Sequence, residues 1–95
     1  MSKPNGHGSH DPGLLQFPCT IDIKALGRRS PRFAALVHEI VSRHIAPHDL
    51  LGTTHRDSGG GRYVAVTLTI RAGSRAQLDA IYQDLSASPD VLVAL

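Results

Sequence analysis

The chain has 95 residues, of which 41% are hydrophobic and 4% aromatic, with one cysteine and a formal net charge of +2 at pH 7. This length accommodates one domain with an aliphatic core, and a single cysteine excludes an internal disulfide. No apolar stretch approaches the roughly 18 residues of a membrane-spanning helix. Two surplus positive charges fall short of the clustering typical of nucleic-acid-binding domains. We therefore expect one cytoplasmic domain without a membrane segment.

Residues 1–13 are rich in glycine, histidine, proline and polar side chains, and no apolar residue follows the first methionine. Such a segment buries too little surface to offset the entropy lost on ordering, so it is predicted to be a disordered tail. His7 and His10 are spaced to hold a metal ion, but no further ligand lies nearby, so no metal site is predicted. Residues 14–95 are expected to form the single folded domain.

Two stretches alternate with the period of two that marks a strand with one buried face. They are residues 19–26, which Gly27 closes, and residues 62–72, the longest β-like run in the chain. The buried positions are predicted to be Cys19, Ile21, Ile23, Ala25, Val64, Val66, Leu68 and Ile70. Because both runs alternate cleanly, they are expected to lie in the middle of a sheet.

Two weaker strands are predicted beside them. Residues 50–57 alternate poorly, and weak polar strands belong at sheet edges. Ser58 and the glycines at 59–61 then form a short connection to the next strand, which favours a hairpin over a phosphate-binding loop. Residues 91–95 form a final short strand with an apolar edge, and weak homodimerisation through that edge is one hypothesis.

Two segments show the three-and-four apolar spacing of amphipathic helices. The first is predicted to begin with Ser30 as its cap and Pro31 at its first position, and to end at Pro47. His44 then lies near the helix C-terminus, where a protonated imidazole interacts favourably with the negative end of the helix dipole. The second helix is predicted to begin after the cap residue Ser74. Its apolar stripe is Leu78, Ile81, Tyr82 and Leu85.

The order strand, helix, strand, strand, helix, strand predicts an α+β, ferredoxin-like β-α-β-β-α-β fold. Right-handed crossovers then give a four-stranded antiparallel sheet of order 4-1-3-2. Both helices are expected to cover one face, and the two cleanest strands fall in the centre.

Several spaced residues together resemble the YbeD-like family of small bacterial proteins. They are Leu15-x-Phe17-Pro18, Lys24-x-x-Gly27, Tyr63-x-x-Val66-Thr67-x-Thr69, Leu78-x-x-Ile81-Tyr82-x-x-Leu85 and Val91-x-Val93-x-Leu95. The resemblance implies a ferredoxin-like fold similar to regulatory ACT domains, and an association of some members with lipoate metabolism. It supplies no catalytic residues. The glycine- and histidine-rich start and the three-glycine hairpin of this chain depart from the family pattern.

Three kinds of function fit this fold. A nucleic-acid-binding module would stack bases on aromatic side chains of the central strands, where this chain offers only Tyr63 at a strand end. A small hydrolase of acylphosphatase-like type would need a catalytic set, and the only facing polar pair, Asp22 and Lys24, is expected to be an exposed ion pair. We therefore expect a non-catalytic regulatory or binding domain without a cofactor, whose partner is a small anionic metabolite or a protein.

One end of the predicted domain gathers basic residues. The end of the first strand, the start of the first helix and the hairpin should meet there, because the first two strands run in the same direction and the third runs back. Residues predicted for an anion-binding site at this end are Gly27, Arg28, Arg29, Ser30, Arg32, Arg56 and Arg62. Arginine side chains and free amides at a helix start suit a carboxylate or a phosphate.

Overall fold

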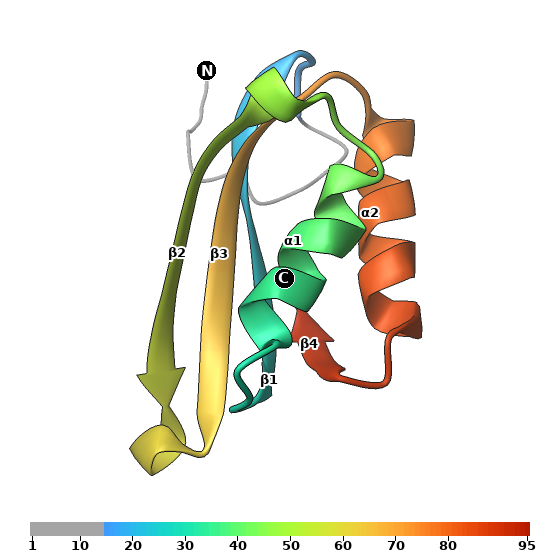
Figure 1. Cartoon of the computed structure of the whole chain (residues 1–95). Helices are drawn as coiled ribbons and strands as arrows, with labels where there is room; N and C mark the ends of the chain where they lie inside the picture. Colours follow the sequence, from blue (N-terminus) through green and yellow to red (C-terminus); the bar gives the residue numbers. More distant parts are fainter. Residues whose placement is uncertain (1–14) are drawn as a thin grey trace, which may run out of the picture.

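Figure 1 shows the protein as a computed structural model, which describes residues 15–95. The elements are β1 (Cys19–Arg28), α1 (Phe33–Ser42), the 3-10 helix η3 (Pro47–Asp49), β2 (Leu50–Ser58), the short turn η4 (Gly59–Gly61), β3 (Tyr63–Ala72), α2 (Arg75–Ala87) and β4 (Val91–Ala94). Neighbouring strands are antiparallel in the order β2-β3-β1-β4, and both helices lie on one face of the sheet (Figure 1). The ferredoxin-like fold and the strand order are as predicted.

The predicted tail at 1–13, with His7 and His10, lies outside the described residues. Among residues 15–95, no helix is long and apolar enough to cross a bilayer. In the same part of the chain, no three histidine, cysteine or acidic side chains gather as a metal ion would require.

The alternating pattern of the two central strands predicts which face is packed, although Cys19 and Ile21 at the start of β1 are half-buried and not buried as predicted. Ile23 and Ala25 of β1 and Val66, Leu68 and Ile70 of β3 have no exposed surface. The helices cover them with Phe33, Val37, Ile40, Val41, Leu78, Ile81 and Leu85. This aliphatic layer supplies the main favourable free energy of folding, because burial contributes about 25 cal/mol per Å² of apolar surface.

β2 is an edge strand, as predicted, and it is exposed along almost its whole length. Figure 1 shows α1 and α2 over the other strands, while β2 extends beside them without a helix above it. The pairing with β3 shifts between Leu50 and Gly52, so the strand carries an irregularity near its start. Leu50 packs against the core, whereas Leu51 is 53% exposed.

Two boundaries at the hairpin end differ from prediction. β1 continues through Gly27 to Arg28, because both residues pair with β3. α1 begins at Phe33 and not at Pro31, and Ser30 is not its cap. The Ser30 hydroxyl instead accepts a hydrogen bond from the Arg32 N–H at 3.1 Å, which forms a tight turn before the helix.

The other end of α1 also differs, since the helix stops at Ser42 and Pro47 begins η3. α2 contacts this end through Gln77 and Asp84, and Arg43 also forms an ion pair with Asp84 at 3.4 Å. Gln77 Nε2 donates to the His44 carbonyl at 2.8 Å, and His44 Nε2 lies 2.9 Å from Asp84 Oδ2. The hydrogen bond with His44 and the nearby Arg43 guanidinium hold the pKa of the Asp84 carboxyl below its usual range. His44 therefore joins the two helices, beyond its predicted place at a helix terminus.

Asp84→Asn tests this joint through its dependence on pH. A carboxyl whose pKa is lowered by folding stabilises the fold above its unfolded pKa, and that contribution disappears as pH falls through the lowered value. The variant should therefore melt below the wild type at pH 7, and the gap should close in acid. Thermal melts from pH 7 to about pH 2.5 check this. Asp79→Asn is the control on α2, because it removes only an exposed ion pair with Arg75, and it should lower the melting temperature at pH 7 much less than Asp84→Asn.

Val66→Asp tests the assignment of the two sheet faces. An unpaired carboxylate on the packed face costs several kcal/mol, against a total stability of about 5–15 kcal/mol. The variant should lose its cooperative melting transition in circular dichroism. Thr67→Asp, the next residue on the opposite face, should remain folded. A folded Val66→Asp protein would show that the faces are reversed.

Candidate anion-binding end

The hairpin end of the molecule is built on the contact between Gly27 and Phe33. The Phe33 ring occupies the space that a side chain on Gly27 would need, and a Cβ there would also come within 2.6 Å of the Asp90 carbonyl oxygen. Phe33 is itself buried. The end of β1, the start of α1 and the residue before β4 therefore meet without room for one methyl group. This packing holds residues 28–32 at the end of the sheet.

The hairpin closes the same end from the other side. Gly59, Gly60 and Gly61 have φ angles of 59°, 70° and 88°, in the left-handed region that glycine adopts without strain. Arg62 Nε donates to the Gly59 carbonyl at 3.3 Å, and the Arg29 N–H donates to the Arg62 carbonyl at 2.9 Å. The loop after β1 is thus hydrogen-bonded directly to the hairpin, so the predicted juxtaposition of loop and hairpin is present.

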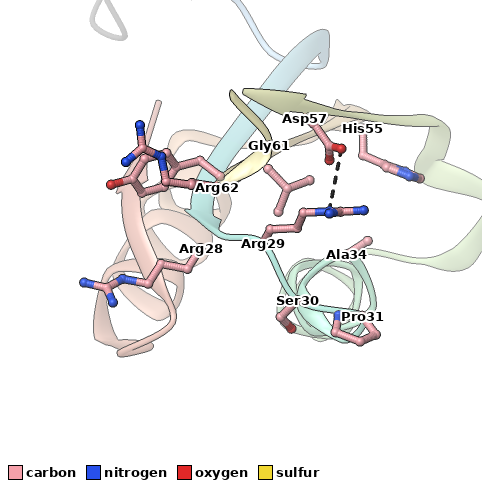
Figure 2. A pocket seen from close by; sticks show the side chains of 11 residues that line it. Arg28, Arg29, Ser30, Pro31, Ala34, His55, Asp57, Gly61 and Arg62 are labelled. Carbon is pink, nitrogen blue, oxygen red and sulfur yellow. Dashed lines mark ion pairs between the residues drawn. The ribbon is translucent and has the colours of Figure 1, made fainter. Parts of the chain in front are cut away.

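The arginines at this end do not share one face. Arg29 points toward β2, where its Nε lies 3.6 Å from Asp57 Oδ2 (Figure 2). Figure 2 shows the Arg28 and Arg62 side chains on the opposite side of the loop. Arg56 is the register partner of Ala65, which places it on the sheet face away from the helices. The cations predicted to converge are therefore divided between two faces.

An open hollow of about 1150 Å³ separates the start of α1 from the hairpin. Its lining residues are Arg28, Arg29, Ser30, Pro31, Ala34, His55, Asp57, Gly61, Arg62, Tyr63 and Val64 (Figure 2). Arg32 instead lines a smaller hollow of about 310 Å³, which it shares with Arg28 and Asp90. His55 and Tyr63 are not among the residues predicted for this end, although the hairpin register brings both to it.

Residues 12–95 match the family described as "Protein of unknown function (DUF493)". The chain belongs to this family. A UPF0250 protein of Paraburkholderia phytofirmans is 40% identical over 82 residues, which cover 86% of this chain and 92% of that protein. A UPF0250 protein of Chromobacterium violaceum is 38% identical over the same coverage. The resemblance to the YbeD-like family is confirmed.

Two solved structures share the fold of this DUF493 protein. Protein HP0495 from H. pylori superimposes with a TM-score of 0.63 at 12% identity, covering 85% of each chain. The C-terminal domain of the MgtC protein from Mycobacterium tuberculosis gives 0.62 at 16% identity, covering 86% of this chain and 89% of that one. At these identities the likeness establishes the architecture alone.

The side chains at this end of the DUF493 protein offer positive charge and hydrogen-bond donors. Guanidinium groups bind carboxylates and phosphates through paired N–H donors. The Asp57 carboxylate already faces Arg29, and the Ser30 hydroxyl already accepts the Arg32 N–H. Arg28 and Arg62 make no ion pair with any residue of 15–95. Arg32 and Arg56 are also outside every ion pair in this part of the chain. Of these four cations, Arg28 and Arg62 line the large hollow, so an anion bound there could meet them without breaking an existing ion pair.

Gly27→Ala tests the packing that positions this end. The added methyl would overlap Phe33 and the Asp90 carbonyl, and overpacking a core typically costs about 1–3 kcal/mol. The melting temperature should fall by several degrees. Gly52→Ala is the matched control, since a Cβ there meets nothing within 4 Å. Equal melting temperatures for the two variants would contradict the packing role of Gly27.

Proposed function

We propose that this protein is a non-catalytic binding domain that recognises a carboxylate or phosphate group at the hairpin end. The observation that carries the proposal is the hydrogen bond from the Arg29 N–H to the Arg62 carbonyl, which fixes the arginine-bearing loop against the hairpin. Arg28 and Arg62 are then held at one end of the sheet with their charge directed away from Asp57 (Figure 2). Rigid placement lowers the entropy lost when a ligand binds.

The charges around the hollow favour binding over group transfer. The acidic side chain that lines the hollow, Asp57, lies beside the Arg29 cation, and one of the two lining hydroxyls, that of Ser30, accepts a backbone N–H. A catalytic site would instead set a nucleophile or an acid against a base within hydrogen-bond reach. We infer a regulatory role, in which occupancy of this end alters what the domain contacts. The resemblance implies an association of some YbeD-like members with lipoate metabolism, so octanoate and lipoate are chosen as carboxylate probes.

Titration with inorganic phosphate, octanoate and lipoate at low ionic strength tests the proposal. Amide chemical shifts should move in a saturable way for residues 27–33 and for Arg62. Replacing both Arg28 and Arg62 with alanine should weaken the binding by tenfold or more, since tenfold equals about 1.4 kcal/mol. Arg75→Ala, which removes a cation from α2, is the matched control. Unmoved amides at 27–33 and 62 with every probe would overturn the proposal.

A further inference from the structure

The sheet face away from the helices carries a row of aliphatic side chains. The register sets Ala65 of β3 beside Leu26 of β1, and Leu26 beside Val93 of β4. Leu95 extends this row, because Lys24 and Leu95 exchange backbone hydrogen bonds of 3.0 and 2.8 Å and so lie opposite each other. Val93 is 44% exposed and Leu95 68%. We call Leu26, Ala65, Val93 and Leu95 the open-face patch.

The patch lies among cations. Lys24 is next to it on β1, Arg56 lies across from Ala65 on β2, and Arg71 lies further along β3. None of these three makes an ion pair with any residue of 15–95. Within the strands, the register assigns one acidic residue to this face, Asp22, and its Oδ1 accepts a hydrogen bond from Thr69 Oγ1 at 2.5 Å. The predicted ion pair of Asp22 with Lys24 is therefore absent.

On the opposite, helix-bearing side, several cations are paired with carboxylates. The arginines that do form ion pairs lie there, with Arg29 on Asp57, Arg43 on Asp84 and Arg75 on Asp79. Charge is thus segregated between the two sides of a small domain. The strip is exposed at Val93 and Leu95 and half-buried at Leu26 and Ala65. An aliphatic strip among cations without ion pairs is complementary to a surface that is both apolar and acidic.

We propose that the open face of the sheet docks an acidic amphipathic helix of a protein partner. Its apolar stripe would cover the open-face patch, and its carboxylates would approach Lys24 and Arg56. Strands lie about 4.8 Å apart, so about three helical turns cross all four. This inference extends the proposed function to a second surface with the same preference for anions, and uses side chains distinct from Arg28 and Arg62.

The side chains of this face favour a protein helix over nucleic acid. Bases stack on aromatic rings at the centre of such a sheet, and the corresponding positions here hold Leu26, Ala65 and Thr67. Tyr63 lies at the hairpin end and is 36% exposed. Aliphatic side chains beside cations match the apolar stripe and acidic flanks of an amphipathic helix.

The test uses a fluorescently labelled synthetic helical peptide of about 20 residues, with a leucine stripe flanked by glutamates. Val93→Glu should weaken its binding by at least tenfold, about 1.4 kcal/mol, because it places a negative charge in the patch. Leu51→Glu is the matched control, with similar exposure on β2, and should change binding less than twofold. Val93→Thr keeps the β-branched shape, so it provides a folded variant with a smaller loss if Val93→Glu melts early.

Two control peptides separate the contributions of charge and apolar surface. Replacing each glutamate with glutamine, or each leucine with serine, should abolish binding. Equal binding by the serine peptide or by a poly-uridine RNA would overturn the proposal, as would an unchanged affinity in Val93→Glu. Self-association of the wild type that Val93→Glu removes would assign the patch to a second copy of the chain and also overturn it. Titration of Val93→Glu with phosphate should still shift the amide resonance of Arg62. The anion site can therefore be tested even if the peptide does not bind.

Discussion

The contact of the Phe33 ring with the backbone of Gly27 is the constraint on which the rest of the hairpin end depends. It brings β1, α1 and the approach to β4 together at a distance that only glycine permits. The pairing of β4 with β1 shifts between Leu26 and Gly27, at the same place. These contacts hold the end of β1, which includes Arg28, and the start of α1. The loop between them begins at Arg29, whose N–H donates a hydrogen bond to the hairpin. A packing requirement in the core thereby sets the position of surface cations.

The two sides of the sheet have different electrostatic roles. On the helix side, oppositely charged side chains meet, and Asp84 joins the ends of both helices through His44 and Arg43. Exposed ion pairs contribute little each, so these contacts chiefly orient the helices. On the open side, cations lie beside aliphatic groups without such partners among residues 15–95. The stability of the fold does not require cations beside exposed aliphatic side chains. We therefore explain this arrangement by a binding role.

The sequence predicts the sheet well, because buried strands repeat every two residues and Val64 to Ile70 follow that period without a break. It predicts the start of α1 less well. Ser30 and Pro31 carry the usual signature of a helix start. In the structure, the Ser30 hydroxyl accepts a hydrogen bond from the Arg32 N–H, and Arg32 occupies the cap position. The local sequence does not decide whether the Ser30 hydroxyl caps the helix or accepts from Arg32. We infer that the packing of Phe33 determines where the helix begins.

The predicted proximity of the arginine loop and the hairpin is present in the structure, whereas the predicted convergence of the arginine side chains is not. Topology alone brings the arginine loop to the hairpin. Successive residues of a strand face opposite ways, however, and β1 extends to Arg28, so Arg28 and Arg29 separate. The boundary of β1 was placed too early at Gly27, and with that boundary the two arginines were expected to act together. The position of His55 beside the hollow depends on the register of the hairpin, in which all three glycines have left-handed backbone angles, and the sequence of the loop does not specify that register.

The exposure of β2 has a consequence for the dynamics of the molecule. This strand is hydrogen-bonded on one side only, to β3, and its residues are exposed along most of its length. Its backbone amides are therefore less protected from solvent than those of the central strands. Elements with few buried contacts open locally at a free energy below that of global unfolding. We therefore expect amide hydrogens of β2 to exchange with solvent through local opening of this strand while β1, β3 and the helices stay folded. His55 and Asp57 of β2 form one wall of the hollow, so such an opening would change the width of the hollow and leave the core intact.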